Sequence, residues 1–403
     1  MKTTDVLEEY NVSRQSLYNW VKYDNLNIDR DIRGHYIWNE KSILNLKEFI
    51  ADRKERNIDT SNKCVETRFG LKNRRYLGAK TRLLPFIKEV VDKHTKDVNL
   101  VADIFGGTGV VSDFFLREGK NIIVNDILKS NYVIYHAFFG DDNVDDKIIV
   151  KYVNEMNNLK ARKNYVSENY GDKYFTMYNA MKIGEAREYI ERKRNLNKRE
   201  KAILLTSILF AMDKVANTVG HYDSYRKKLD MIEPIHFKIP DYYQLDKRRV
   251  SFSSKDANLL IREIHPDLIY IDTPYNSRQY GDVYHVLENI VTWKKPELFG
   301  VARKPHDRRD TKSLYSTSKA PKAFEDLIGN IQSKYVLVSY NNMAQKGTGR
   351  SNAKISNEEI ISILEKRGKV EVFRTDFQAF TTGKSEIKGH KELLYLLTIG
   401  DER

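Results

Sequence analysis

The chain has 403 residues and a net charge of +13, from 69 Lys and Arg against 56 Asp and Glu. This excess favours a polyanionic partner such as nucleic acid, because neutralising phosphates releases counterions. A single cysteine, Cys64, excludes a disulfide within the chain and a cysteine-rich zinc site. The charged N-terminus lacks the apolar core of a signal peptide, and the longest apolar stretch, Ala202–Met212, is too short to span a bilayer. We therefore expect a cytoplasmic protein with no membrane segment.

Residues 1–50 predict a helix-turn-helix module. Asp5–Glu9 can form one short helix, and Ser13 can cap a second helix that would enter a major groove. Ile32–Trp38 (IRGHYIW) alternates around Gly34 like the wing hairpin of a MerR-type module. The alternative is a small helical dimerisation or docking domain.

Residues 51–70 are polar and charged without an apolar period, which predicts a linker. From 71 to 403, short apolar runs alternate with longer helical or irregular segments. Such runs are typical of an α/β fold with a twisted, mostly parallel sheet that binds ligands at the carboxyl ends of its strands. Four of these runs are Asn99–Phe105, Asn121–Asp126, Asp267–Asp272 and Lys334–Tyr340. Between the second and third runs, residues 135–250 form a long insertion that is mostly helical in pattern.

The segment Ala102–Gly109 (ADIFGGTG) predicts a nucleoside site. An apolar strand runs there into a turn with several glycines, which allow close approach of the backbone to a ligand. The next predicted strand ends in Asn125-Asp126, and an acidic residue at that place can accept both ribose hydroxyls. This pattern alone does not distinguish NAD from adenosylmethionine.

A second segment, Asp267–Tyr280 (DLIYIDTPYNSRQY), predicts chemistry on an exocyclic amine. The lone pair of such an amine is delocalised into the ring, so two hydrogen-bond acceptors are needed to aim it at a methyl group. Asp272 can be one acceptor, and the backbone carbonyl of Thr273 or Pro274 can be the other. Tyr275 offers an aromatic face for a base that has left the duplex.

Five motifs occur in an order that resembles one family: Tyr76–Lys80 (YLGAK), Asp103–Gly109, Asn125-Asp126, Lys255-Asp256 and Asp272–Tyr275. The chain resembles the Dam-like class of adenine-specific DNA methyltransferases over roughly residues 74–400. Within that class it is similar to modification enzymes of type IIS restriction systems of the FokI kind. The resemblance implies a class I adenosylmethionine-dependent methyltransferase fold, S-adenosyl-L-methionine as cofactor, and transfer of a methyl group to N6 of adenine.

The resemblance also implies roles for individual residues. It assigns cofactor binding to Tyr76, Lys80, Asp103, Phe105, Gly107, Gly109, Asp126 and Asp256. Among these, Lys80 would lie near the cofactor's carboxylate, Asp126 would hold the ribose and Asp256 would meet the adenine. It assigns catalysis to Asp272, Pro274 and Tyr275. Thr273 departs from the family pattern, which usually has proline there; because that position acts mainly through its backbone, we still expect activity.

In this family, target recognition lies between the cofactor motifs and the catalytic motif, where the insertion at about 135–250 occurs. Its polar, aromatic segment Thr218–Arg226 (TVGHYDSYR) can present side chains to phosphates and bases. We expect substrate contacts from Thr273, Asn276, Arg278, Gln279, His221 and Tyr222. The scattered histidines show no spacing for a metal site, so we expect no metal.

The sequence thus predicts a site-specific N6-adenine methyltransferase that binds double-stranded DNA as a monomer, beside a cognate restriction endonuclease. One alternative keeps the chemistry and changes the substrate to cytosine N4 in DNA or adenine in RNA. Asp272 argues against cytosine, because related enzymes that act on cytosine tend to have serine there. A second alternative is a MerR-like regulator whose larger domain only senses a nucleoside.

Overall fold

The computed structural model describes residues 3–10, 17, 21, 26–31, 34–50, 68–243, 249–274, 277–341, 353–376 and 391–400. The chain divides into two compact units, Met1–Thr67 and Arg68–Arg403. Of the predicted linker, residues 51–67 lie outside the described residues. Its last three residues, 68–70, belong to the second unit. There Phe69 stacks on Phe210 with 4.4 Å between ring centroids, and its backbone N–H donates to the Ile239 carbonyl.

The first unit contains helix α1 (Thr3–Glu9) and a helical segment over residues 40–50. Its described core consists of Val6, Leu17, Leu26, Ile28, Trp38 and Leu46. Arg30 and Tyr36 form an antiparallel bridge around Gly34, whose φ of +82° suits the turn between them. This bridge lies where the wing was expected, and Ile32 and Arg33 of the expected wing lie outside the described residues. The expected second helix falls largely outside the described residues, so the helix-turn-helix stays a prediction.

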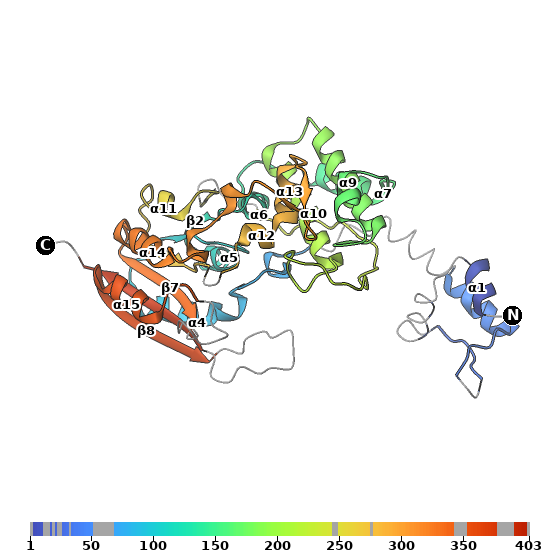
Figure 1. Ribbon diagram of the computed structural model, residues 1–403, viewed down its shortest axis with the longest axis horizontal. Helices are drawn as coiled ribbons and strands as arrows, with labels where there is room; N and C mark the ends of the chain where they lie inside the picture. Colours follow the sequence, from blue (N-terminus) through green and yellow to red (C-terminus); the bar gives the residue numbers. More distant parts are fainter. Residues whose placement is uncertain are drawn as a thin grey trace. The chain divides into compact units, whose positions relative to one another are not determined.

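The described part of the second unit forms a seven-stranded sheet in the order β3-β2-β1-β4-β7-β9-β8 (Figure 1). The first five strands in this order are parallel, whereas β9 is antiparallel to both of its neighbours. In sheet order the strands are β3 (Val250–Ser253), β2 (Asn121–Asn125), β1 (Leu100–Asp103), β4 (Leu268–Ile271), β7 (Tyr335–Asn341), β9 (Lys391–Ile399) and β8 (Gly368–Asp376). The predicted α/β class and all four predicted strand runs are confirmed.

The strand order reverses between β1 and β4, since β2 follows β1 on one side and β7 follows β4 on the other. Connections leave in opposite directions at such a point, which opens a crevice at the carboxyl ends of the strands. The residues that follow β1 and β4 at this crevice begin with Ile104 and Asp272. The fold thereby brings together two motifs that are far apart in the sequence.

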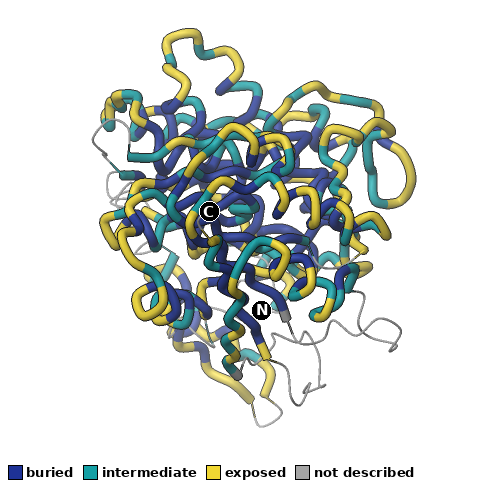
Figure 2. Tube along the Cα trace, turned by 90° about the vertical axis from the view of Figure 1, so that its left-hand side faces the viewer, coloured by how far each residue is buried: buried dark blue, intermediate teal, exposed yellow. Residues whose placement is uncertain are grey.

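Helices pack on both faces of the sheet. The inner strands β1, β4, β7 and β9 are mostly buried, whereas the edge strands β3 and β8 have no buried residue among those described, and Figure 2 shows the buried stretches of the chain. One face packs against helices α11 (Ala257–Leu260), α14 (Ala320–Gly329) and α15 (Asn357–Glu365) around a shared apolar core. On the other face, α5 (Val110–Arg117) contacts β1 and β2, and α4 (Leu84–His94) places the His94 ring against Phe373 of β8 at 4.4 Å. Side chains along the inner strands point alternately toward these two layers of helices. Packing on both faces keeps the crevice rigid.

The predicted insertion is helical. Between β2 and β3 the chain forms α6 (Lys129–Phe139), α7 (Asp146–Asn158), α8 (Tyr165–Tyr170), α9 (Met177–Arg192) and α10 (Lys198–Val215). Helix α10 contacts α6, α7 and α9, and its apolar run Ala202–Met212 is buried as their centre (Figure 1). Lys182 of α9 is buried too, and its ammonium group donates to the carbonyls of Asn157 and Leu159 at 2.7 and 2.6 Å, which caps the end of α7.

The chain after β4 completes the crevice. It forms α12 (Tyr280–Val283), α13 (His285–Thr292) and a small hairpin of β5 (Leu298–Phe299) and β6 (Lys304–Pro305). Short 3-10 turns occur at η1 (Leu71–Asn73), η2 (Thr81–Leu83), η3 (Arg309–Thr311) and η4 (Leu314–Ser316). Within the described ranges, no helix is long and apolar enough to cross a membrane.

Candidate active site

The glycine-containing turn after β1 lies at the centre of the crevice. Gly107 and Gly109 have φ values of +50° and +79°, a region that favours glycine, and Gly109 caps the start of α5. Gly106 is packed so tightly that a Cβ atom there would lie 2.6 Å from Val124 Cγ2. The backbone N–H of Gly106 also donates to the Asn125 carbonyl at 2.8 Å. The turn therefore has one conformation, which a larger side chain would break.

Asp126 follows β2 and fixes this turn from the neighbouring strand. Its carboxylate accepts the Gly107 N–H at 2.9 Å and the Leu128 N–H at 2.8 Å. Burial raises the pKa of Asp126, while these backbone donors oppose the shift. A carboxylate held in this way lies at the crevice with a fixed direction.

Asn125 ties three strand ends together, a role that sequence reasoning missed. Its amide N–H groups donate to the carbonyls of Ile104 and Lys255 at 3.1 and 3.0 Å, and its oxygen accepts the Ser253 hydroxyl at 2.7 Å. Since these partners follow or end β1 and β3, the asparagine of the Asn125-Asp126 pair sets the strand edge. Next to it, Asp256 accepts the Asn258 N–H at 2.9 Å and so caps α11.

Asp103, at the end of β1, is a buried carboxyl with one unused acceptor. Its Oδ2 accepts the Ser112 hydroxyl at 2.8 Å, and its Oδ1 is buried with no hydrogen-bond partner in the described structure. Burial raises the pKa of Asp103 to about 7, and the Ser112 hydrogen bond opposes that shift. An unsatisfied acceptor of this kind is stabilised by a cationic donor.

The ring of Tyr76 forms an aromatic border of the crevice. It stacks on Tyr284 with centroids 4.5 Å apart and 7° between the rings, and Asn131 donates to its hydroxyl at 3.1 Å. The Arg74 guanidinium, which is buried, lies 4.7 Å from the centroid of the Tyr76 ring. The ring of Tyr280 lies 5.7 Å from that of Tyr76. Neither Arg74, Tyr280 nor Tyr284 was expected from the sequence.

Asp272 follows β4 and pairs with Lys80. The Lys80 Nζ lies 2.9 Å from Asp272 Oδ1, and both side chains are largely buried. Burial raises the pKa of Asp272, and the Lys80 charge and hydrogen bond lower it in part. On β9, Glu392 is buried beside this pair, and burial raises its pKa to about 7. Lys80 is therefore the cation that opposes the effect of burial on Asp272.

The turn after Asp272 is only partly described. Thr273 is buried, and it is not among the residues that line the crevice. Pro274 lines the crevice beside Asp272. Tyr275 and Asn276, predicted for catalysis and substrate contact, lie outside the described residues.

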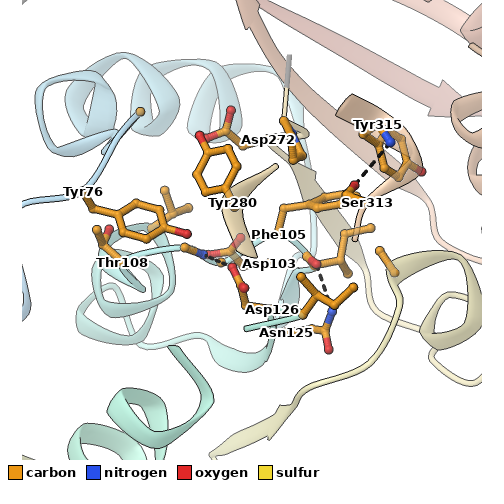
Figure 3. A pocket seen from close by; sticks show the side chains of 18 of the residues that line it. Tyr76, Asp103, Phe105, Thr108, Asn125, Asp126, Asp272, Tyr280, Ser313 and Tyr315 are labelled. Atoms are coloured by element: carbon orange, nitrogen blue, oxygen red, sulfur yellow. Dashed lines mark hydrogen bonds between the residues drawn. The ribbon is translucent and has the colours of Figure 1, made fainter. Parts of the chain in front are cut away.

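These residues surround one cavity with about 860 Å³ of space free of protein atoms, part of which is open to solvent. Figure 3 shows Asp103, Asp126 and Asp272 around it, with the rings of Tyr76 and Tyr280 at its border. The predicted site residues that line it are Tyr76, Lys80, Asp103, Phe105, Gly107, Asp126, Asp256, Asp272 and Pro274. Gly109 lies just behind this lining, at the start of α5.

A wall of this cavity comes from a segment with no recognisable motif. Thr311, Ser313 and Tyr315 line it, and the Tyr315 ring meets Phe105 edge-on with centroids 5.1 Å apart. The Tyr315 hydroxyl donates to the Asn258 side chain at 2.7 Å, which joins this segment to α11. No local sequence signal marks these residues, because tertiary packing alone brings them to the site.

The predicted substrate contacts separate into two groups. His221 Nε2 and Arg278 Nη1 lie 3.3 Å apart, so the structure brings these two together. Tyr222 is only 2 % exposed and donates its hydroxyl to Asp213 at 2.9 Å, which places it in the core, where a base cannot reach it. Gln279 donates to and accepts from the Ser313 backbone at 3.0 and 2.8 Å. That side chain fixes the wall of the cavity.

No cluster of three or more His, Cys, Asp or Glu side chains suited to a metal occurs in the part of the chain that the structure describes.

Residues 76–346 match the family described as D12 class N6 adenine-specific DNA methyltransferase. The chain is 33% identical to the modification methylase StsI of Streptococcus sanguinis over 80% of this chain and 51% of that protein. It is 30% identical to the type II methyltransferase M.FokI of Planomicrobium okeanokoites over 78% of this chain and 50% of that protein. It is 28% identical to M.NlaIII of Neisseria lactamica over 78% of this chain and 95% of that protein. The chain thus spans about half the length of StsI and M.FokI, and the resemblance inferred from the five motifs is confirmed.

Proposed function

Because this chain belongs to the D12 class of N6 adenine-specific DNA methyltransferases, we propose that it transfers a methyl group from S-adenosylmethionine to the N6 amine of adenine at a specific site in double-stranded DNA. The observation that carries the proposal is the position of Asp272 beside Lys80, in the same cavity as the glycine turn and Asp126. The family description favours adenine in DNA over the cytosine, RNA and regulator alternatives.

The residues of the cavity fit the cofactor. Asp103 Oδ1 is a buried acceptor without a partner, which suits the ammonium group of an amino acid. Lys80 would hold the carboxylate, and Asp126, fixed by two backbone N–H groups, would accept the ribose hydroxyls. Phe105 and Asp256 line the part of the cavity left for the adenine ring.

When bound, S-adenosylmethionine supplies a methyl group on a positively charged sulfur. The chain's own residues have to orient the attacking amine. Asp272 would accept a hydrogen bond from the adenine N6, and the backbone carbonyl of Thr273 or Pro274 would accept the second. Two acceptors hold the amine so that its lone pair points at the methyl group, and Asp272 stabilises the positive charge that develops on the nitrogen.

Lys80 controls the charge of Asp272 in this scheme. Burial raises the pKa of Asp272, and an acid that kept its proton could not accept a hydrogen bond from the amine through that oxygen. The ammonium group at 2.9 Å acts in the opposite direction and favours the ionised carboxylate. Tyr275, as the aromatic face for the base, stays a prediction from the motif.

We infer that the chain is the modification partner of a restriction endonuclease. It acts on host DNA in the cytoplasm, as a monomer. Support comes from StsI and M.FokI, which carry the names modification methylase and type II methyltransferase. The remaining predicted substrate contacts, His221 and Arg278, lie beside the catalytic turn and are proposed to meet DNA.

The test is nucleoside analysis by mass spectrometry after incubation of the purified chain with unmodified duplex DNA and S-adenosylmethionine. We expect N6-methyladenine and no N4-methylcytosine. Methylated cytosine alone, or methylation of RNA but not of DNA, would overturn the proposal.

A further inference from the structure

The β5–β6 hairpin follows the catalytic turn and contributes no residue to the lining of the active-site cavity. Its strands are joined by the turn Gly300–Arg303, in which the Arg303 N–H donates to the Gly300 carbonyl at 3.2 Å. Gly300 and Arg303 have φ values of +68° and +51°, so the turn is tight. At its tip Val301 is 79 % exposed, the largest exposed fraction of any bulky apolar residue in the described structure.

The turn is held from below by two buried side chains. The Ala302 carbonyl, next to Val301, accepts the Tyr174 hydroxyl at 2.9 Å and lies 2.8 Å from His285 Nε2. Tyr174 belongs to the helical insertion, whereas His285 belongs to α13. Both are buried. Because its neighbour is anchored to the core, Val301 is presented on a fixed support and not on a loose loop.

The same anchors join the hairpin to the loop over residues 217–226. The Tyr174 hydroxyl also lies 3.0 Å from the Tyr222 carbonyl, and Lys304 Nζ lies 2.7 Å from Asp223 Oδ1. Asn217 closes the loop, since its carbonyl accepts the Arg226 N–H at 2.9 Å and its side chain donates to the Arg226 carbonyl at 2.9 Å. On this loop Val219 is a second exposed apolar residue.

This pair of loops reaches the catalytic turn. His221 of the loop lies 3.3 Å from Arg278, and Ser316 donates its hydroxyl to the Arg278 carbonyl at 3.0 Å. The Tyr222 N–H donates to the Val283 carbonyl at 2.9 Å, which fixes the loop against α12. Hairpin, loop and catalytic turn therefore form one continuous support.

We propose that the hairpin turn Gly300–Arg303 and the loop 217–226 form a single surface that binds duplex DNA next to the extruded adenine, with Val301 inserted as an apolar wedge into the base stack and Arg303 on a phosphate. This inference rests on the proposed function. Wedges of this kind stabilise a duplex whose bases have been unstacked, because the apolar tip covers the exposed base faces.

Charge on this surface favours DNA as the occupant. Lys227 and Lys228 follow the loop and are exposed, and no ion pair to them or to Arg303 occurs in the described structure. Arg303 belongs to the same turn as Val301, and the two lysines directly follow the loop. The proposed surface therefore offers cations to phosphates, whose contact releases counterions, and an apolar tip to base faces.

The test compares Val301→Ala with wild type on two duplexes that carry the methylated sequence. In one, the target adenine is paired with thymine, and in the other it faces a mismatched base and leaves the stack at lower cost. We expect Val301→Ala to lower kcat/KM by about tenfold on the paired duplex and by less than about twofold on the mismatched one. Equal losses on both duplexes, or no loss on either, would overturn the wedge. Val372→Ala, a partly exposed valine on β8, is the matched control and should leave both rates unchanged.

A binding experiment separates failure of this inference from failure of the proposed function. If the wild-type chain methylates no adenine, the proposed function fails, and the surface is tested by fluorescence anisotropy with labelled duplex DNA. Val301→Asp should then weaken duplex binding by about tenfold against Val372→Asp, and Arg303→Gln should reduce the slope of log affinity against log salt by about one. Equal duplex affinity of the Val301 and Val372 variants, or no duplex binding by the wild type, would overturn the surface.

Discussion

The proposed cofactor side of the active-site cavity and the neighbouring surface proposed as its substrate side are built in different ways. The cofactor side consists of the turn after β1 and the carboxylate after β2, two segments on adjacent strands that bond directly to each other. The substrate side lies outside the cavity lining and brings together Tyr174, His221, Arg278 and Lys304 from distant parts of the chain. A local motif fixes the first side, and only the tertiary fold fixes the second. Variants should therefore separate cofactor binding from DNA binding.

The largest expected effect separates catalysis from cofactor binding. Asp272→Asn keeps the size of the side chain and removes the charge that Lys80 holds at 2.9 Å. We expect kcat to fall by at least about 100-fold, because one of the two acceptors for the amine loses its charge. Cofactor affinity, measured by calorimetry, should change by less than about threefold. A parallel loss of cofactor binding would contradict the division of the cavity.

The next effect falls on the cofactor side. Asp126→Ala removes the acceptor of the Gly107 and Leu128 N–H groups as well as the proposed ribose contact. We expect cofactor affinity to weaken by about 10- to 100-fold, since hydrogen bonds to a charged group are lost. Duplex affinity without cofactor should stay unchanged. As a control, Asp92→Ala removes an exposed carboxylate that pairs with Lys88 and should alter neither affinity.

A third prediction concerns pH and the buried carboxyl of Asp103. Burial raises its pKa to about 7, so its proton favours the folded state, and that contribution to stability is lost as the pH rises through 7. Asp103→Asn should therefore stabilise the cofactor-free chain at pH 8, by on the order of 2 kcal/mol, and by less at pH 5. Urea unfolding at both pH values measures this difference. The same variant should weaken cofactor binding, and a gain in stability that is equal at both pH values would contradict the assignment.

The smallest effect sharpens the substrate side. Tyr174→Phe removes the hydroxyl that lies between the Tyr222 and Ala302 carbonyls. We expect duplex affinity to fall by about threefold to tenfold and the free energy of unfolding to fall by about 1 kcal/mol. Cofactor affinity should not change. If duplex binding were unaffected while stability fell, the hydroxyl would have a structural role only.

The sequence predicted which segments meet at the cavity because their signals are local. Glycines at positive φ, an acidic residue after β2 and the carboxylate after β4 each follow from one short segment. The strand order then brings Asp103 and Asp272 to one crevice, as a parallel sheet requires where its order reverses. The α/β class and the helical insertion could be predicted for the same reason. Both follow from the spacing of apolar residues and from the length of the apolar runs.

The substrate side was predicted less well because its residues act through contacts across the fold. Tyr222 has a polar hydroxyl and stands in a polar segment, yet its hydroxyl is used by Asp213 inside the core. Gln279 follows the catalytic motif, yet its amide is used by the Ser313 backbone. The wall at Tyr315 and the anchor at Tyr174 carry no motif at all. Whether a polar side chain faces a ligand or a neighbouring segment depends on long-range packing, which a local pattern does not contain.

The most direct test of the central claim is long-read mapping of modified bases. Unmodified genomic DNA is incubated with S-adenosylmethionine and either the wild-type chain or Asp272→Ala, after cofactor binding by both proteins has been verified. The account predicts methylated adenine in one short sequence motif with the wild type and none with the variant. Methylated adenine that persists with Asp272→Ala, or a wild type that binds cofactor and leaves the DNA unmodified, would contradict it.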